Sequence, residues 1–471
     1  SVTLYEHVNY EGASVTSTND ESNLVNVFFI PTEKLEVKNG YFFTQITSRP
    51  TIDGWHAGDM HTHSWYTYAD WIVSGEFGPP PETMAEIAKA CGLDFVVLTD
   101  HTDYWLNEEG YSDMISETTS ITSTDFLMLQ GEEVMCAWAA RKIWGHAPEL
   151  LCLAPEWFIS RSPYDAQSVL ERTYQAGGLV FVAHPVTGQW DFGNMHGYEG
   201  LEVWNGDWDD GDEWTLKKWD ELLQAEKDPA DGFWVGIGNS DAHDLRSLGI
   251  TRTYVYLPRG LSEAELKKAL QEGHCVFSNG PLTVFELQNC GRTTEIGELA
   301  IVPPNTTLSF YFDWTEGVDR IELYKDGDLL TTSTGAVTLP RIYDSVGSSH
   351  YFRCVGRSTD GHFKCFTNPI WVKVGSPDAE PPAVSITSCP PPYVARQPVT
   401  VGWVADDLYT GVERCEVYLN NTLQGVPDTN SWTFDVLADG NYEAKIVAYD
   451  YAGNSGSHCI TFKVDATPPT T

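Results

Sequence analysis

The stretch Gly58-Asp-Met-His61-Thr-His63-Ser64 places two histidines at alternate positions of a strand-like run. Alternate residues of a strand project to the same side, so both imidazoles can reach one ion. Taken alone, such a pair is more often structural or incidental than a metal site. Further residues of metal-ligand type change that interpretation, because they follow in order, each just after an apolar, strand-like segment: Asp100-His101, Glu133, His146, His184 and Asp241-Ala-His243.

The chemistry of this set points to transition metals. Imidazole and carboxylate ligands together suit Zn, Mn or Fe, and the set is larger than the three or four ligands that one ion accepts. We therefore expect a cluster of two or three divalent metal ions. The sequence has no G-x-S-x-G elbow and no competing series of Ser, His and Asp.

Residues from about 52 to 281 alternate strand-like and helix-like segments, which predicts parallel strands joined by helical crossovers. Buried strands are expected at 93–98, 178–183, 200–204 and 233–237, and helices at 81–90, 162–176 and 261–270. The candidate ligands then stand at the carboxyl ends of strands, where the loops of a (β/α) barrel gather catalytic groups.

After Pro281 short alternating strands with Gly, Asn and Asp turns take over, which is typical of β-sandwiches. A linker near 375–382 separates two such modules, and Asp378-Ala-Glu-Pro-Pro382 recurs as Asp465-Ala-Thr-Pro-Pro469, about one sandwich domain later. The expected organisation is a small N-terminal β segment over 1–51 with a βγ-crystallin-like opening, a barrel over 52–281, a β-sandwich over 282–375 and an immunoglobulin-like sandwich over 376–471.

Composition excludes two classes of partner. The 471 residues are too many for one core, and 28 Lys+Arg against 67 Asp+Glu give a net charge of -39. Such a charge repels nucleic acids and anionic membrane surfaces, and no apolar run is long enough to span a bilayer. The cysteine pairs Cys136/Cys152 and Cys354/Cys365 suit disulfides of an exported protein, while buried free thiols fit equally well.

The ordered stations H-x-H, T-D-H, G-x-E, H-P and D-x-H resemble those of the PHP (polymerase and histidinol phosphatase) superfamily over about 52 to 281. The tail Glu272-Gly-His-Cys-Val-Phe-Ser-Asn-Gly-Pro-Leu282 further resembles the branch of carbaryl-hydrolase-like (CehA/McbA-type) metallohydrolases. The resemblance implies an α/β fold, a PHP-type distorted (β/α)7 barrel with appended all-β immunoglobulin-like sandwich domains. Carried over station by station, it implies a first metal held by His61, His63, Glu133 and Asp241, a second by Glu133, His146 and His184, and a third by His101 and His243.

Three further assignments follow from the resemblance and the spacing. The family usually supplies another ligand a few residues after the H-x-H pair, and we expect Asp70 there, although the run 65–70 departs from the common serine-aspartate-glycine pattern. Glu132 is the rival of Glu133, but the G-x-E spacing from Gly131 favours Glu133. Asp100 is expected to orient a ligand rather than to coordinate an ion.

Several ions in one pocket lower the pKa of a bound water and polarise the bond being broken, so the expected reaction is hydrolysis by a metal-activated hydroxide. Asp241 or Asp103 would accept or relay a proton. Three basic side chains would meet substrate oxygens, namely Arg246, Arg141 and Lys142.

Three functions compete at this point. The first is a metal-dependent phosphoesterase, the activity most associated with the superfamily. The second is a carboxylic ester or carbamate hydrolase, which would suit aromatic residues near the ligands: Trp65, Tyr66, Tyr68, Trp71, Trp190, Trp204 and Trp208. The third is an exported glycan- or partner-binding protein with a structural metal site. The expected partner is a small-molecule or glycan-linked ester. Strings of such sandwich modules resemble those of bacterial exported proteins, so we expect a periplasmic, cell-surface or extracellular location.

Overall fold

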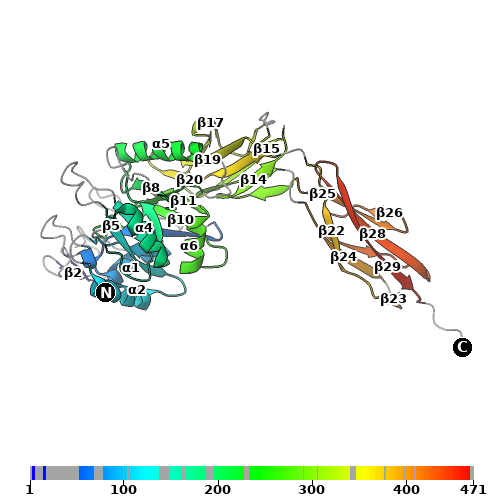
Figure 1. Ribbon diagram of the computed structural model, residues 1–471, viewed down its shortest axis with the longest axis horizontal. Coiled ribbons are helices and arrows are strands. Elements are labelled where there is room, and N and C mark those ends of the chain that lie inside the picture. Colours follow the sequence, from blue (N-terminus) through cyan, green and yellow to red (C-terminus); the bar gives the residue numbers. More distant parts are fainter. Residues whose placement is uncertain are drawn as a thin grey trace.

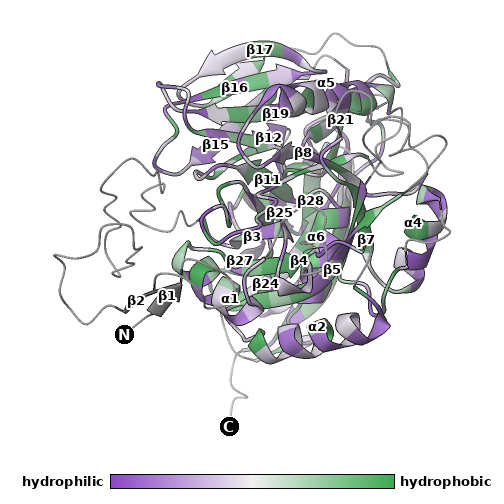
Figure 2. Cartoon of the chain, turned by 90° about the vertical axis from the view of Figure 1, so that its left-hand side faces the viewer, coloured by the Kyte–Doolittle hydropathy of each residue, from purple (hydrophilic) through white to green (hydrophobic). Residues whose placement is uncertain are grey.

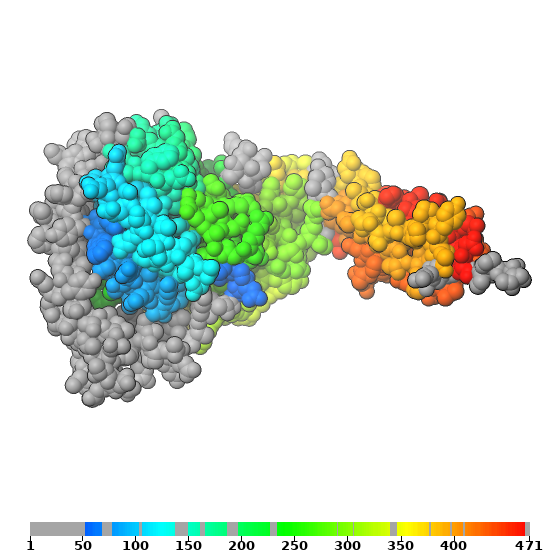
Figure 3. Space-filling model, turned by 90° about the horizontal axis from the view of Figure 1, so that it is seen from below, coloured from blue at the N-terminus to red at the C-terminus, as the bar shows by residue number. Residues whose placement is uncertain are grey.

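The computed structural model describes residues 3–5, 14–16, 52–67, 78–102, 106–136, 149–160, 165–185, 196–226, 233–289, 291–304, 306–339, 346–375, 378–395, 398–407 and 410–466. The elements before residue 282 form one end of an elongated arrangement, the strands of 283–374 lie beside them, and the strands of 383–464 form the other end (Figure 1). Seen from below, the C-terminal part meets the rest through a narrow connection (Figure 3).

The first unit is organised around a mixed sheet. In chain order its strands are β3 (Trp55–Thr62), β4 (Phe95–Leu98), β5 (Leu127–Met135), β6 (Glu149–Leu153), β7 (Leu179–Val182), β8 (Gly200–Asn205), β9 (Val235–Asn239), β10 (Arg252–Tyr256) and β11 (Cys275–Ser278). Strands β3, β4 and β5 pair in parallel, as do β7, β8 and β9, whereas β6 runs antiparallel to both β5 and β7. Strand β10 runs antiparallel to β3 and to β11.

The (β/α)7 barrel predicted from the sequence is wrong. The described residues are 45% strand and only 17% helix, whereas a (β/α) barrel needs parallel strands that each lead into a helix. Strands β6, β10 and β11 break that pattern by running antiparallel to their neighbours. A short apolar run such as Glu149–Leu153 predicts a buried strand but carries no information on its direction.

Helices flank this sheet: α1 (Pro81–Ala90), α2 (Glu108–Ile121), α4 (Ala166–Gln175), α5 (Asp210–Ala225) and α6 (Glu263–Gln271), with a short 3-10 helix, η2 (Trp65–Thr67), after β3. The helices predicted at 81–90, 162–176 and 261–270 are present, whereas α2 and α5 were not predicted. Proline opens α1, and side-chain caps start the other four: Asn107, Asp165, Asp209 and Ser262. Figure 2 shows hydrophilic residues along the outer sides of α2 and α4.

The second unit is a β-sandwich whose strands are β12 (Thr283–Asn289), β13 (Arg292–Thr294), β14 (Leu299–Val302), β15 (Leu308–Trp314), β16 (Arg320–Lys325), β17 (Asp328–Ser333), β18 (Val337–Leu339), β19 (Ser349–Arg357), β20 (Lys364–Thr367) and β21 (Ile370–Val374). One layer, β13-β12-β15-β18, packs its Phe285 and Phe310 against the other layer, which contains Phe352. Strand β20 pairs with β11, so the first unit's sheet continues without interruption past the boundary expected at residue 281.

The third unit is an immunoglobulin-like β-sandwich. Its strands are β22 (Ala383–Ser388), β23 (Tyr393–Val394), β24 (Val399–Asp406), β25 (Val412–Leu419), β26 (Thr422–Gly425), β27 (Ser431–Phe434), β28 (Gly440–Asp450) and β29 (Ser455–Val464). Sheets β22-β24-β27 and β23-β29-β28-β25-β26 enclose a separate core that includes Val401, Trp403, Val417 and Ile446. Alternation of buried and exposed residues along β24 and β25 produces this two-layer packing. At the N-terminus, β1 (Thr3–Tyr5) pairs with β2 (Ser14–Thr16), and the rest of the segment predicted over 1–51 lies outside the described residues.

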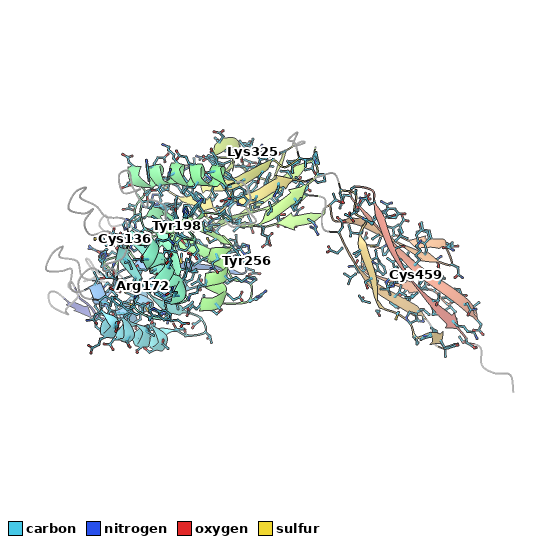
Figure 4. The ribbon with its side chains drawn as sticks, viewed as in Figure 1. Cys136, Arg172, Tyr198, Tyr256, Lys325 and Cys459 are labelled. Carbon is cyan, nitrogen blue, oxygen red and sulfur yellow. The ribbon has the colours of Figure 1, made fainter. Side chains whose placement is uncertain are left out.

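The nine described cysteines are free thiols, so neither of the two pairs suggested by the spacing forms a disulfide. Cys136 and Cys459 illustrate how widely the cysteines are spread, since they lie in the first and third units (Figure 4). Within the described ranges, none of the helices has the length and apolar character that a membrane span requires.

Candidate metal centre

Seven of the predicted ligands converge at one edge of the first unit's sheet: His61, His63, His101, Glu133, His184, Asp241 and His243. They stand at or just beyond the carboxyl-terminal parts of β3, β4, β5, β7 and β9, which point the same way and therefore end at the same edge. Backbone bridges join Thr62 to Ala242 and His101 to Glu133, which draws these segments together. Asp70, Asp103 and His146 lie outside the described residues.

Glu133 occupies the middle of this cluster. Its Oε2 lies 2.8 Å from His101 Nδ1 and 3.5 Å from the Nε2 atoms of both His61 and His63, and its Oε1 lies 2.8 Å from His184 Nε2. The side chain is only 2% exposed. One buried carboxylate shared by several imidazoles is the arrangement expected of a ligand that bridges two ions.

Asp241 is the second carboxylate of the cluster. Its Oδ1 lies 3.0 Å from His63 Nε2, 3.3 Å from His61 Nε2 and 3.7 Å from His243 Nδ1. Asp241 and His184 also have positive φ angles, 53° and 23°, which are unusual for residues other than glycine. Backbone strain of this kind gathers at functional sites, because surrounding contacts must hold it in place.

Glu202 was missed by sequence reasoning. It lies on β8, is buried, and contacts His61 Nδ1 through both carboxylate oxygens, at 3.0 and 3.1 Å. The available signal was a charged residue inside the apolar strand Gly200–Asn205. Such a residue is rarely buried without a specific partner, so its position in the strand indicates a polar contact inside the protein.

Two buried aspartates hold the backbone around the cluster. Asp100 accepts hydrogen bonds from the amide and hydroxyl of Ser64 and from Thr67 Oγ1, which in turn lies 3.4 Å from His63 Nδ1. Asp59 accepts hydrogen bonds from the amides of Ser240 and Gly249, at the two ends of the segment that carries Asp241 and His243. Both aspartates thus bind backbone and hydroxyl groups next to the candidate ligands, as residues that orient metal ligands do.

Burial and neighbouring charges push the pKa values of the cluster apart. Burial would lower the pKa of His61, but nearby carboxylates, first that of Asp241, outweigh burial and raise the pKa well above its usual value. Burial, and then repulsion from imidazoles led by His243, lowers the pKa of His63 to about 3. Burial opposes ionisation of Glu133, but the surrounding imidazoles hold the pKa of this carboxyl well below its usual range. His63 and Glu133 thus favour the unprotonated forms that metal ligands need, whereas an ion bound at His61 would have to displace a proton.

The donor set fits divalent ions at three overlapping positions, defined by the groups His61/Glu133/His184, His61/His63/Asp241 and His63/His101/His243. A buried atom supports this fit: His61 Nε2 makes no hydrogen bond to any described residue, although it faces the carboxylates of Asp241 and Glu133. A buried polar atom left without a hydrogen bond costs about 1–3 kcal/mol, and an ion between the imidazole and the carboxylates removes that cost.

Other predicted residues lie away from the cluster or serve other purposes. Glu132 points to the other face of β5, where its Oε1 accepts the amide of Ile159 at 2.7 Å. Arg246 is 60% exposed and pairs with Asp244 at 2.9 Å. Arg141 and Lys142 lie outside the described residues.

The aromatic candidates divide between core and surface. Trp204 is buried, and Trp208 stacks on Phe366 of the second unit with ring centroids 5.1 Å apart. Trp65, by contrast, is 42% exposed and lies two residues after His63. Core packing therefore accounts for Trp204 and Trp208, whereas Trp65 is accessible to solvent. Three of the predicted aromatic residues lie outside the described ranges: Tyr68, Trp71 and Trp190.

A separate acidic group consists of one residue before β22, one just after β24 and the last residue of β28: Asp378, Asp407 and Asp450. Asp407 accepts hydrogen bonds from the amides of Thr410 and Gly411, and Asp450 accepts two from Asn454. These oxygens hold the turns that follow β24 and β28.

No protein-family model and no curated protein matches the chain. Solved structures with partial likeness include fibronectin(III)-like modules of Clostridium thermocellum CbhA, at 18% identity, a TM-score of 0.20, and coverage of 36% of this chain and 88% of that chain. A central fibronectin-III array of RIM-binding protein is 14% identical with a TM-score of 0.16, covering 35% of this chain and 66% of the other. A Bacteroides ovatus glucan-utilisation protein, SGBP-B, in complex with a mixed-linkage heptasaccharide, is 14% identical with a TM-score of 0.14, covering 35% and 42%. At these TM-scores, the likenesses define neither a family nor an activity.

Proposed function

We propose that this protein is a metal-dependent hydrolase of ester bonds, with phosphoesters as its first substrate class. The observation that carries the proposal is the contact of Glu133 with four imidazoles in a cluster that also contains Asp241. Core histidines that serve packing alone satisfy their ring nitrogens with ordinary hydrogen bonds, whereas His61 Nε2 has none within the described ranges.

The ligands divide naturally between ions. Glu133 and His184 with His61 would hold one ion, and His101 and His243 with His63 would hold another. Asp241 would serve the position between His61 and His63. Divalent ions bound there would activate a water and polarise the scissile bond, so no protein nucleophile is needed.

The protein groups around the ions have their own tasks. Burial opposes ionisation of Asp241, but His61 and His63 hold its pKa far below the usual range, so Asp241 is an anion at neutral pH. A group with so low a pKa suits metal binding better than proton transfer, because a general base works best with a pKa near the operating pH. Strain at Asp241 and His184 supports the same role, since their backbones are held in unusual conformations that aim the side chains at the cluster.

Phosphoesters stand first because their hydrolysis is the activity most associated with the superfamily that the motifs resemble. Arg246 pairs with Asp244, so positive charge for an anionic substrate would have to come from the ions. The test is a screen of full-length protein loaded with Zn, Mn or Fe against p-nitrophenyl phosphate, bis-p-nitrophenyl phosphate, p-nitrophenyl acetate and a naphthyl carbamate. Turnover of the phosphates supports the proposal, and turnover of only the acetate or carbamate assigns the carboxylic ester or carbamate class. Metal binding without turnover of any ester contradicts a hydrolytic function.

We also propose export of the protein to the periplasm, the cell surface or the medium, with the two sandwich units serving as spacers or as contacts for a surface glycan. The successive β-sandwich units of residues 283–374 and 383–464 support this proposal. Fractionation of cells that produce the protein naturally tests it, because an exported protein is recovered outside the cytoplasm.

A further inference from the structure

We propose that Glu202 is a positioning residue of the metal centre: it sets the tautomer of His61 and, through Asn205, the orientation of Asp241. One buried carboxylate would then prepare two ligands for a divalent transition-metal ion. This inference rests on the proposed function, because it concerns the same site. Glu202 itself is on β8 and contacts no other carboxylate of the cluster within hydrogen-bond distance among the described residues.

Donors converge on Glu202 from several segments of the chain. Its Oε1 lies 3.0 Å from His61 Nδ1 and from Asn239 Nδ2. Its Oε2 accepts the backbone amide of His184 and the Nδ2 of Asn205, each at 3.0 Å. These segments follow or belong to β3, β7, β8 and β9, so Glu202 connects most of the strands that carry ligands.

Two of the groups that contact Glu202 can act only as hydrogen-bond donors. A backbone amide such as that of His184 donates in every state. Asn239 is fixed as a donor because its Oδ1 already accepts the amide of Met60 at 3.0 Å. Glu202 must therefore be an acceptor at both oxygens, which leaves His61 Nδ1 as a donor. An imidazole that keeps its proton on Nδ1 can offer a lone pair to an ion only at Nε2, and this is the atom that faces Asp241 and Glu133.

Asn205 extends the same network to Asp241. Its Nδ2 donates to Asp241 Oδ2 at 3.3 Å as well as to Glu202. Its backbone amide donates to Asp212 Oδ1 at 3.0 Å. With Oδ2 held by Asn205, Oδ1 is the oxygen turned toward His61 and His63. Glu202 and Asn205 thus aim a nitrogen and an oxygen ligand at a common position.

Glu202→Gln tests the proposal, because the glutamine amide turns one acceptor into a donor that faces other donors. The matched control is Glu132→Gln: both residues are buried glutamates on strands of the same sheet, β5 and β8, but Glu132 faces away from the cluster. The readout is the affinity of the full-length protein for Zn²⁺ and Co²⁺, from competition with a chromophoric chelator, together with metal content by elemental analysis. Circular dichroism reports whether each variant folds.

We expect Glu202→Gln to weaken metal affinity by about 10–100-fold, as loss of an outer-shell partner of a metal-binding histidine does, while Glu132→Gln stays at the wild-type value. The visible absorption of bound Co²⁺ should also change in Glu202→Gln, because the geometry of the ligands changes, and Glu202→Asp should restore part of the affinity. Wild-type affinity and spectrum in a folded Glu202→Gln protein would overturn the proposal.

Asn205→Ala keeps the proposal testable if Glu202→Gln fails to fold, because Asn205 is only partly buried. It should weaken affinity less than Glu202→Gln, since it frees Asp241 but leaves His61 held. An unchanged metal affinity in Asn205→Ala would show that Glu202 does not position Asp241 through Asn205. If the wild-type protein binds metal but hydrolyses no ester, the proposed function is contradicted but the proposed role of Glu202 is not. If the wild-type protein takes up no metal, both proposals are contradicted.

Discussion

The imidazole rings of His63 and His243 lie stacked, with centroids 4.0 Å apart and planes inclined by 16°. Two protonated rings in this arrangement would repel each other without water to screen them. Burial and the proximity of His243 accordingly lower the pKa of His63 to about 3, so His63 is neutral at physiological pH. The neutral ring of His63, stacked on His243 beside the anionic Asp241, would form part of a pocket that a cation completes.

Metal content is the first prediction. Protein purified without chelator or affinity-tag metal is expected to contain about two or three equivalents of Zn, Mn or Fe per chain by elemental analysis. Exhaustive chelation should lower the unfolding temperature of the first unit, because an ion present at 1,000 times its dissociation constant stabilises the native state by about 4 kcal/mol. The absence of metal, with no uptake on incubation, would favour a binding protein over a hydrolase.

Substitution of single ligands gives the second prediction. His61→Ala and Asp241→Ala should each lower ester hydrolysis by more than about 100-fold, because each substitution removes a metal ligand itself and not a residue that only orients a ligand. The β-sandwich units should stay folded, as judged by circular dichroism, since the ligands belong to the first unit. The matched control is His196→Ala, an exposed histidine outside the cluster, which should keep full activity. A fully active His61→Ala, Asp241→Ala double variant would show that the cluster is not the active site.

The third prediction concerns pH. Burial, opposed by hydrogen bonds from the amides of Asn205 and Asp209, raises the pKa of Asp212 from 3.8 to about 7. The folded state then holds this proton more tightly than the unfolded state, so unfolding free energy should fall as pH rises from about 4 to about 7, at roughly 1.4 kcal/mol per pH unit at most. Asp212→Asn mimics the protonated form and should remove this dependence. Denaturant titrations at several pH values measure it, and parallel curves for the two proteins would refute the assignment.

The fourth prediction concerns the junction between the first two units. Arg353 on β19 is 2% exposed and binds Asp220 of α5 through two hydrogen bonds, at 2.9 and 2.6 Å. Arg353→Leu should destabilise the protein by about 3–5 kcal/mol, because it leaves a partly buried carboxylate without its charge partner. Lys217→Ala, which breaks an exposed pair on the same helix, should change stability by less than about 0.5 kcal/mol. Chemical denaturation compares the two variants, and equal effects would show that the Arg353 pair contributes nothing beyond a surface contact.

Much of the candidate site could be anticipated because its residues follow apolar strands in the chain. His61, His63, Glu133, His184 and Asp241 were found from residue type and from their position at strand ends. Glu202 was not, because a charged residue inside an apolar strand indicates a buried partner but does not identify it; its role depends on contacts with residues on or next to β3, β7 and β9. Residue type alone does not separate an aromatic residue that contacts a ligand from one in the core, and the packing of Phe366 against Trp204 and Trp208 assigns these two to the core.

The sequence alone establishes the features that depend on local pattern and residue chemistry. These are the buried strands, the helix at Pro81–Ala90, the two sandwich units and the order of the metal-ligand residues. Tertiary structure alone decided the direction of β6, β10 and β11 and the continuation of one sheet through β20, which replaced the predicted barrel. It also decided that Nε2 of His61 faces Glu133 and Asp241 and that Oε1 of Glu133 faces His184. Hydrophobic periodicity reports burial and repeat, whereas strand direction and side-chain contacts depend on pairing between separate segments of the chain, such as those that carry His61 and Glu202.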